Sequence, residues 1–288
     1  MGVVLSSRNT ASSNLFPSDP SQLKKSVEEC FLHKASPTKM PPASEPKGRV
    51  AGILAPHGPM SHAGPIAAHC YYYISGLKGI DTVILLGPVH KPSSAQKVSI
   101  YPKGSWSSPL GNMEIDDALA EQILNDCKLG ERSATLFDSE NCLDMHIPFL
   151  QFIFHNIKLV PILMQDQSVE TSLTLGKAIG KIVKENKGAL VIATSNLTHG
   201  MVYAQALRRD AMIFDLLPKP AFLDIKKIYS TVQEKQLSVC GYGPIMALIT
   251  VVQQLGCRTG LNLKYGTSGE TEGNYANVTG YTATVFQL

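Results

Sequence analysis

The sequence predicts an α/β protein with a mainly parallel or mixed central sheet flanked by helices. Its strongest signals are three short apolar runs, at 50–55, 82–86 and 189–193. These runs lack polar alternation and contain β-branched residues, which is typical of strands with both faces covered. Segments of helical periodicity separate the runs. Strands that alternate with helices indicate a sheet of mainly parallel strands between helical layers.

The N-terminal part begins with residues 1–20, which we expect to be irregular. Ser21 is predicted to cap a helix that ends near Leu32. Residues 34–48 are rich in Pro, Ser and Lys and are predicted to form a loop. The first strand at 50–55 is then followed by a helix over 63–75.

The remaining elements follow from the same signals. We expect helices over 116–127, 146–155, 169–185, 204–216, 220–233 and 245–254. Further strands are predicted at 98–101, 158–164, 261–265 and 278–286, with a loop over 266–277. Neither an internal repeat of 20 to 50 residues nor a linker is visible, so we expect one domain over residues 1–288.

Composition narrows the class of partner. The chain has 288 residues, a formal net charge of +3 and no run of five basic residues, so no nucleic-acid partner is expected. The strongest apolar run, at 82–86, is far shorter than the ~20 residues that span a bilayer, so no membrane span is expected. The N-terminus lacks a secretory pattern, and the six cysteines form no C-x-x-C pair. We therefore expect reduced thiols and a cytoplasmic location.

Histidines follow the three strongest strands, each in a short polar loop. They are His57, His90 and His199. Ligands of open α/β sheets bind beyond the carboxyl ends of the strands, so these rings converge if the three strands are neighbours. Imidazole is the commonest metal ligand and the usual acid or base near neutral pH. Two neutral histidines with one anionic group form an open site for iron(II) or a related metal.

The anionic group has three candidates: Glu140, Asp144 and Cys240. Glu140 lies with His146 in a polar segment that leads into a helix, where capping and surface charge are alternative roles. Cys240 precedes a predicted helix, and a thiol near a helix N-terminus has a lowered pKa that makes it a better ligand or nucleophile. A buried, inert thiol is the alternative. His62, after the first strand, is a further candidate for the pocket wall.

Several short motifs, in this order and spacing, resemble the Memo family. They are 53–58, 85–90, 140–148, 195–200 and 240–244, joined by 15–17, 108–110 and 280–281, and they span nearly the whole chain. Prokaryotic members of this family include proteins named AmmeMemoRadiSam system protein B. The family is similar in fold to class III extradiol dioxygenases, which are non-haem iron(II) enzymes that open catechol rings. The resemblance implies the same fold for this chain.

The resemblance also implies roles for the site residues. By resemblance, His57, His90 and Cys240 are the metal ligands. His199 matches the acid/base histidine of the dioxygenases. Animal members of the family are linked to cell motility and to copper- or iron-dependent redox chemistry. The resemblance also implies that Glu140 and His146 line the same pocket, which makes them further candidates for catalytic roles.

Two positions depart from the related patterns. The Memo family usually has an aspartate where this chain has Asn196, so one carboxylate is absent from the expected pocket. The ring-cleaving enzymes use a glutamate as third ligand, and Cys240 stands in that region here. A thiolate is softer and more oxidisable than a carboxylate, and it favours copper or zinc as well as iron.

The leading hypothesis is a Memo-like metal-binding protein with a redox-active His/His/Cys site. Its cofactor is expected to be a divalent or redox metal, iron(II) or copper first and zinc as a further candidate. One alternative is an adaptor that binds a peptide or small anion in the same pocket without metal. The other is an extradiol ring-cleaving dioxygenase. The sequence leaves open the identity of the small-molecule or peptide ligand and the oligomeric state.

Overall fold

An eight-stranded mixed sheet forms the centre of the molecule. A computed structural model describes residues 6–10, 13–91 and 96–288. The strand order is β10-β11-β2-β9-β3-β8-β4-β7, and β2, β9, β3 and β8 run parallel to one another. The predicted α/β class with a mainly parallel or mixed sheet is confirmed. The bounds are β2 (Val50–Ala55), β3 (Thr82–Pro88), β4 (Val98–Ile100), β7 (Gly130–Arg132), β8 (Lys158–Met164), β9 (Ala189–Thr194), β10 (Thr259–Thr267) and β11 (Gly280–Gln287).

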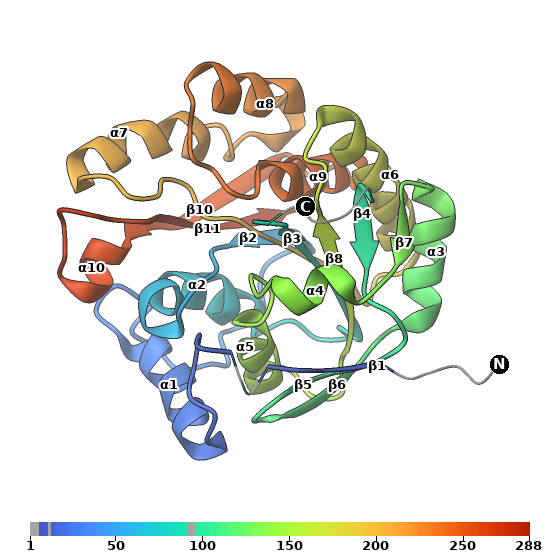
Figure 1. The fold of residues 1–288 in the computed structure, drawn as a ribbon, viewed down its shortest axis with the longest axis horizontal. Helices are drawn as coiled ribbons and strands as arrows, with labels where there is room; N and C mark the ends of the chain where they lie inside the picture. Colours follow the sequence, from blue (N-terminus) through green and yellow to red (C-terminus); the bar gives the residue numbers. More distant parts are fainter. Residues whose placement is uncertain (1–5, 11–12, 92–95) are drawn as a thin grey trace.

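Helices cover both faces of this sheet, which explains the unbroken apolar runs. Successive side chains of a strand point to opposite faces. On β3, Val83 and Leu85 join one buried core while Ile84 and Leu86 join the other. The first core lies under α1 (Pro20–Leu32), α2 (Met60–Ile74) and α5 (His146–Ile153), which Figure 1 shows together on one side of the sheet. The second lies under α3 (Asp117–Cys127), α6 (Val169–Glu185) and α9 (Tyr242–Gln254).

A second, smaller sheet lies beside the first and includes the N-terminal strand. It has the order β1-β5-β6, made from β1 (Ser6–Asn9), β5 (Gly104–Ser108) and β6 (Gly111–Glu114). The expectation that residues 1–20 are irregular is therefore wrong for β1, while residues 1–5 and 11–12 lie outside the described residues. Strand β1 pairs in parallel with β5, a long-range partner that its own polar sequence does not reveal.

Several helix boundaries differ from the prediction because of local capping. Helix α1 begins at Pro20, because Asp19 rather than Ser21 accepts the capping hydrogen bond from the Gln22 amide. The helix predicted over 220–233 is broken: a short 3-10 turn precedes α8 (Ile225–Glu234), which Asp224 caps. Helix α7 spans Tyr203–Phe214.

The prediction of a loop over 266–277 is wrong in one part. It contains α10 (Ser268–Glu272), which opens with a capping box formed by Thr267 and Glu270. A further short helix, α4 (Thr135–Ser139), precedes the segment that carries Glu140. None of the helices in the described ranges is long and apolar enough to cross a membrane.

Candidate metal centre

The three histidine-bearing loops meet because their strands are neighbours. Strand β9 lies between β2 and β3 and pairs in parallel with both. Their carboxyl ends therefore lie at one edge of the sheet, where His57 follows β2, His90 follows β3 and residues 195–200 follow β9. This arrangement is the one expected from the sequence.

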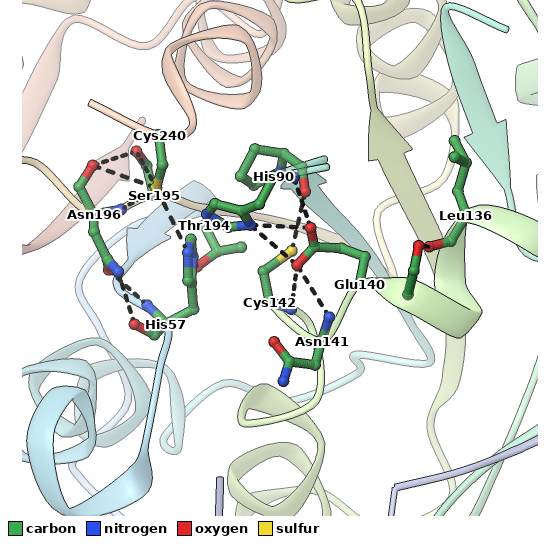
Figure 2. Close-up of polar contacts among 12 residues, drawn as sticks. His57, His90, Leu136, Glu140, Asn141, Cys142, Thr194, Ser195, Asn196 and Cys240 are labelled. Carbon is green, nitrogen blue, oxygen red and sulfur yellow. Dashed lines mark hydrogen bonds and ion pairs between the residues drawn. The ribbon is translucent and has the colours of Figure 1, made fainter. Parts of the chain in front are cut away.

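Two of these histidines and Cys240 form a compact cluster (Figure 2). The candidate ligand atoms of His57, His90 and Cys240 all lie within 4.8 Å of one another. Cys240 Sγ is 3.5 Å from His57 Nε2, and the rings of His57 and His90 have centroids 5.2 Å apart. His57 is buried, Cys240 is partly buried and His90 is exposed, so the cluster opens to solvent on the side of His90.

The cluster suits a metal ion in donor type, and one pair of its candidate ligand atoms has the spacing that a tetrahedral ion requires. With metal–nitrogen and metal–sulfur distances near 2.0 and 2.3 Å, two donors on a tetrahedral ion lie about 3.3–3.6 Å apart. The 3.5 Å separation of Cys240 Sγ and His57 Nε2 falls in this range. Two imidazoles and one thiolate form a donor set that suits copper, zinc and iron.

Hydrogen bonds orient the ring of His57 toward the cluster. Its Nδ1 lies 3.0 Å from Thr194 Oγ1, and that hydroxyl donates its own proton to the Ala55 carbonyl. The hydroxyl must therefore accept from Nδ1–H, which assigns the tautomer from the hydrogen-bond pattern. Nε2 then faces Cys240. Such outer partners fix the orientation of a metal-binding histidine.

Glu140 orients the ring of His90 in the same way. Its carboxylate oxygens lie 3.0 and 3.1 Å from His90 Nδ1, and they also accept the backbone amides of His90, Asn141 and Cys142. Burial raises the pKa of Glu140, but the hydrogen bonds from His90 and these amides outweigh it and lower the pKa to about 2. Hydrogen bonds with Cys240 and then with Glu140 raise the pKa of His90 to about 10. Positive charge is thus favoured beside the thiolate.

Cys240 lies in a loop just before α9 that several hydrogen bonds hold in place. Its Sγ accepts the Asn196 amide at 3.1 Å, and the Gln167 side chain bridges the Cys240 carbonyl and the Gly243 amide at 2.8 Å each. Burial raises the pKa of the thiol. The charge of His57 and hydrogen bonds with three histidines outweigh this effect and hold the pKa well below its usual value. These interactions favour the thiolate in this site.

His199 lies at the rim, with its ring held toward the thiol. Its Nδ1 donates to the Ser238 carbonyl at 2.8 Å, and its amide donates to Ser238 Oγ. Burial lowers the pKa of His199, whereas the interactions with Cys240 and the Ser238 carbonyl more than reverse this and raise it. An exposed imidazole that is poised beside an anion can take up or release a proton.

Asn196 makes two hydrogen bonds to the backbone of His57, of which an aspartate could make only one. Its side-chain oxygen accepts the His57 amide at 3.0 Å, and its side-chain nitrogen donates to the His57 carbonyl at 3.0 Å. A carboxylate could make only the first bond, because it has no N–H to donate. Asn196, which the sequence places in the expected pocket, therefore holds the backbone of the candidate ligand His57.

Two further candidates, Asp144 and His62, lie apart from the cluster. Asp144 is buried against Arg8, with 3.0 Å between Oδ2 and Nη2. His62, on the first turn of α2, has its Nδ1 3.0 Å from a carboxylate oxygen of Glu272. Cys240 is thus the one of the three anionic candidates that the structure brings into the cluster of ligand atoms.

His146 is completely buried at the start of α5. Its Nδ1 shares a 2.6 Å hydrogen bond with the Tyr71 hydroxyl, while its Nε2 has no partner among the described residues. Burial, and then the charge of His57, lower its pKa to about 3. His146 is therefore neutral in the folded protein at physiological pH.

Buried neutral His146 is expected to weaken the fold in acid. In the unfolded chain its pKa is near 6.5, so between pH 6.5 and pH 3 the unfolded state binds the additional proton and stability falls as the pH falls. Lowering the pH from 7 to 5 should cost about 2 kcal/mol through this one group. Urea unfolding at both values should show that loss in the wild type and a correspondingly smaller one in His146→Gln. His155→Gln, which replaces an exposed histidine, is the matched control. An equal loss of stability in the two variants would contradict the expectation.

Sequence reasoning missed the residues that orient the cluster. These residues are Thr194, Ser238, Gln167 and Tyr71. Thr194 carries a weak signal, since it is the polar last residue of an otherwise apolar strand. The other three come from distant segments, so their partners become visible only in the folded chain.

An open pocket adjoins the cluster on the side of His90. Its volume is about 300 Å³, enough for a small molecule or one or two side chains of a peptide. Larger hollows of about 540 and 580 Å³ lie elsewhere, the first beside α1 and the second beside β5. We associate the smaller pocket with the site because of what lines it: Arg8, His90, Lys91, Asp138, Ser139, Glu140 and Asn141.

Comparison with known proteins identifies the family. The model of the "Memo-like protein" family matches residues 8–285. A MEMO1 family protein of Sulfolobus acidocaldarius is 34% identical, covering 95% of this chain and 96% of its own. A MEMO1 family protein of Methanopyrus kandleri is 32% identical, covering 94% and 95%.

A solved structure, of an uncharacterized protein from Escherichia coli K12, covers 80% of this chain and 98% of its own at 12% identity, with a TM-score of 0.49. A likeness at that level supports no inference about the site. The family match and the relatives extend over nearly the whole chain, and they agree with the resemblance seen in its motifs. The chain belongs to the Memo-like family.

Proposed function

We propose that this protein binds one metal ion through His57, His90 and Cys240 and uses it in redox chemistry. The observation that carries the proposal is the convergence of two imidazoles and a thiolate within 4.8 Å, with both Nδ1 atoms tied to other partners. Iron(II) or copper is favoured, and zinc is the alternative without redox chemistry. A bound iron or copper ion would supply one-electron chemistry and open coordination positions.

The surrounding residues would serve this site in different ways. Glu140 would orient His90 and balance the charge of the cluster, since it is buried and ionised. His199 would move a proton at Nε2, because its Nδ1 is engaged by the Ser238 carbonyl. His146 would remain neutral, since burial and the charge of His57 lower its pKa to about 3. The six cysteines of the structure are all free, which accords with a reducing, cytoplasmic setting.

Two other functions compete with this proposal. A metal-independent adaptor is favoured by the open pocket of about 300 Å³ beside His90, which a peptide or small anion could enter. Ring cleavage of catechols has weaker support, because a thiolate occupies the place where the ring-cleaving enzymes have a glutamate. Catechols with iron(II) and oxygen would give a yellow product only in the second case.

Metal analysis of the purified protein tests the proposal. The wild type, loaded with iron(II), copper or zinc and desalted, should retain about one ion per chain. His57→Ala/His90→Ala should retain none, because two of three donors are lost. His62→Ala, which removes a side-chain contact with Glu272, is the matched control and should retain metal like the wild type. Equal metal content in the wild type and the double variant would overturn the metal site.

A further inference from the structure

The N-terminal strand reaches the candidate metal centre through one side chain. Strand β1 pairs with the edge of β5 through four residues, and Arg8 extends from it into the protein. The Arg8 side chain is only 13% exposed, and its guanidinium lies over the ring of the buried Trp106, 4.8 Å from the centroid. A cation packed this way against an aromatic face is held in place.

Arg8 binds the segment 137–144 at three points. Its Nε and Nη2 contact the two carboxylate oxygens of Asp144 at 3.1 and 3.0 Å. Nη2 also donates to the Glu140 carbonyl at 2.8 Å, and Nη1 donates to the Phe137 carbonyl. Only the planar fork of an arginine can reach a carboxylate and two carbonyls together.

The same segment supplies the carboxylate that orients His90. While Arg8 holds the Glu140 backbone, the Glu140 side chain binds Nδ1 and the amide of His90 at 3.0 and 2.7 Å. The path from the strand to the ligand is therefore short: Arg8, Glu140, His90. The N-terminal strand and His90 are far apart in the sequence, and the segment 137–144 joins them.

Asp144 completes the attachment. It is 2% exposed, and Arg8 is its ion-pair partner. Burial raises the pKa of Asp144 to about 6 even though Arg8 opposes the rise. Loss of Arg8 would leave this carboxyl buried without a counter-charge, so the segment would have to rearrange.

We propose that Arg8 is a positioning residue for the metal centre, and that strand β1 acts through it as a clamp on the segment 137–144. The clamp keeps the Glu140 carboxylate where it orients His90 Nδ1, so the order of the N-terminal strand sets the affinity for the metal ion. This inference rests on the proposed function for its effect on metal binding. The clamp itself concerns the protein alone and can be measured without metal.

Two measurements on full-length variants test the proposal. Cobalt(II) serves as the metal probe, with its affinity and its thiolate absorption followed by titration. Arg8→Met should bind cobalt about tenfold more weakly, at the lower end of the effect of losing an outer-sphere partner. Arg8→Lys, which retains the charge but not the fork, should fall between it and the wild type. In metal-free protein, hydrogen exchange should accelerate in Arg8→Met at the amides that Glu140 binds: His90, Asn141 and Cys142.

The matched control is Arg132→Met. Arg132 is 17% exposed, pairs with Asp117 and donates to the Tyr101 carbonyl, so it resembles Arg8 in burial and bonding but lies on β7. It should leave cobalt affinity and those three amides unchanged.

Combining Arg8→Met with Glu140→Gln tests the path. The second substitution should add little to the first, because both act on His90 through one carboxylate.

The outcomes separate the clamp from the metal site. Arg8→Met with the same amide exchange as Arg132→Met would overturn the clamp. Faster exchange with unchanged cobalt affinity would overturn its coupling to the metal centre. A wild type that binds no cobalt, iron, copper or zinc would overturn the proposed function, while the exchange rates would still decide whether Arg8 holds the segment.

Discussion

Replacing Cys240 by serine is expected to weaken the binding of zinc and copper by more than about 100-fold, beyond the effect of losing an outer-sphere partner. The thiolate is the anionic member of the ligand cluster, with its Sγ 3.5 Å from His57 Nε2. A serine hydroxyl is neutral at pH 7 and binds soft metal ions poorly. The loss should be smaller for iron(II) and smallest for manganese(II), which depend less on sulfur.

The fold should tolerate this substitution. The serine oxygen can accept the Asn196 amide that Sγ accepts in the wild type at 3.1 Å. The bonds from the Gln167 side chain to the Cys240 carbonyl and the Gly243 amide are independent of the thiol. Thermal unfolding should therefore change little, and lost affinity would report the loss of a ligand rather than of structure.

Competition titrations with a chelator measure the affinities, and cobalt(II) absorption reports the thiolate directly. Cys127→Ser is the matched control, since Cys127 is buried in α3 with its Sγ near the Leu124 carbonyl. It should retain both the affinity and the absorption band. Zinc or copper affinity within tenfold of the wild type in Cys240→Ser would show that the thiolate is not a ligand.

The sheet and the position of the cluster could be predicted because they depend on local patterns. Strands β2, β3 and β9 are buried on both faces, so each appears in the sequence as an apolar run. Each ends in a polar loop at the same edge. Convergence of the histidines requires that the three strands be neighbours, and the sheet order confirms that they are.

The small sheet and the bracing of the site could not be predicted in this way. Strand β1 has the sequence Ser-Ser-Arg-Asn, and its order comes from pairing with β5 almost 100 residues away. The roles of Glu140 and Asn196 depend on which atom each side chain presents to a histidine. Such choices arise from tertiary contacts, which neither periodicity nor spacing records.

Asn196 shows what the structure adds at a single position. From the sequence alone, an asparagine in place of the usual aspartate removes a negative charge from the pocket. The structure shows a carboxamide that uses both its oxygen and its nitrogen on the His57 backbone. The substitution therefore bears on the rigidity of a ligand loop as well as on the charge of the site.

Gly280→Ala is expected to produce a large loss of stability next to the site. A Cβ at Gly280 would overlap Asp210 Oδ2, well inside van der Waals contact. Asp210 is buried and accepts hydrogen bonds from the Thr198 amide and the Tyr265 hydroxyl at 2.9 and 2.8 Å. The carboxylate would have to move and give up bonds that satisfy it.

The expected loss is about 3 kcal/mol in the free energy of unfolding, from overpacking together with broken bonds to a buried carboxylate. Urea unfolding measures it. Gly256→Ala is the comparison for a glycine in open space, because φ is +81° and no atom lies within 4 Å of the added Cβ. It should lower the free energy of unfolding by about 1 kcal/mol, the cost of a left-handed conformation for alanine. In an Asp210→Ala background, Gly280→Ala should lower the free energy of unfolding much less, because the carboxylate that the added Cβ would overlap is absent. Equal costs in both backgrounds would show that the clash is relieved some other way.

The same substitution should disturb the metal centre through the backbone. The Gly280 amide donates to the Thr198 carbonyl at 2.8 Å, and the Gly280 carbonyl accepts the Leu197 amide at 2.9 Å. These two bonds tie β11 to the loop whose Asn196 braces His57 and whose His199 faces Cys240. A shift of β11 should therefore reduce cobalt affinity in Gly280→Ala while the protein is still folded, whereas Gly256→Ala should bind cobalt like the wild type. Unchanged affinity in a destabilised Gly280→Ala would mean that the ligand loop keeps its geometry without β11.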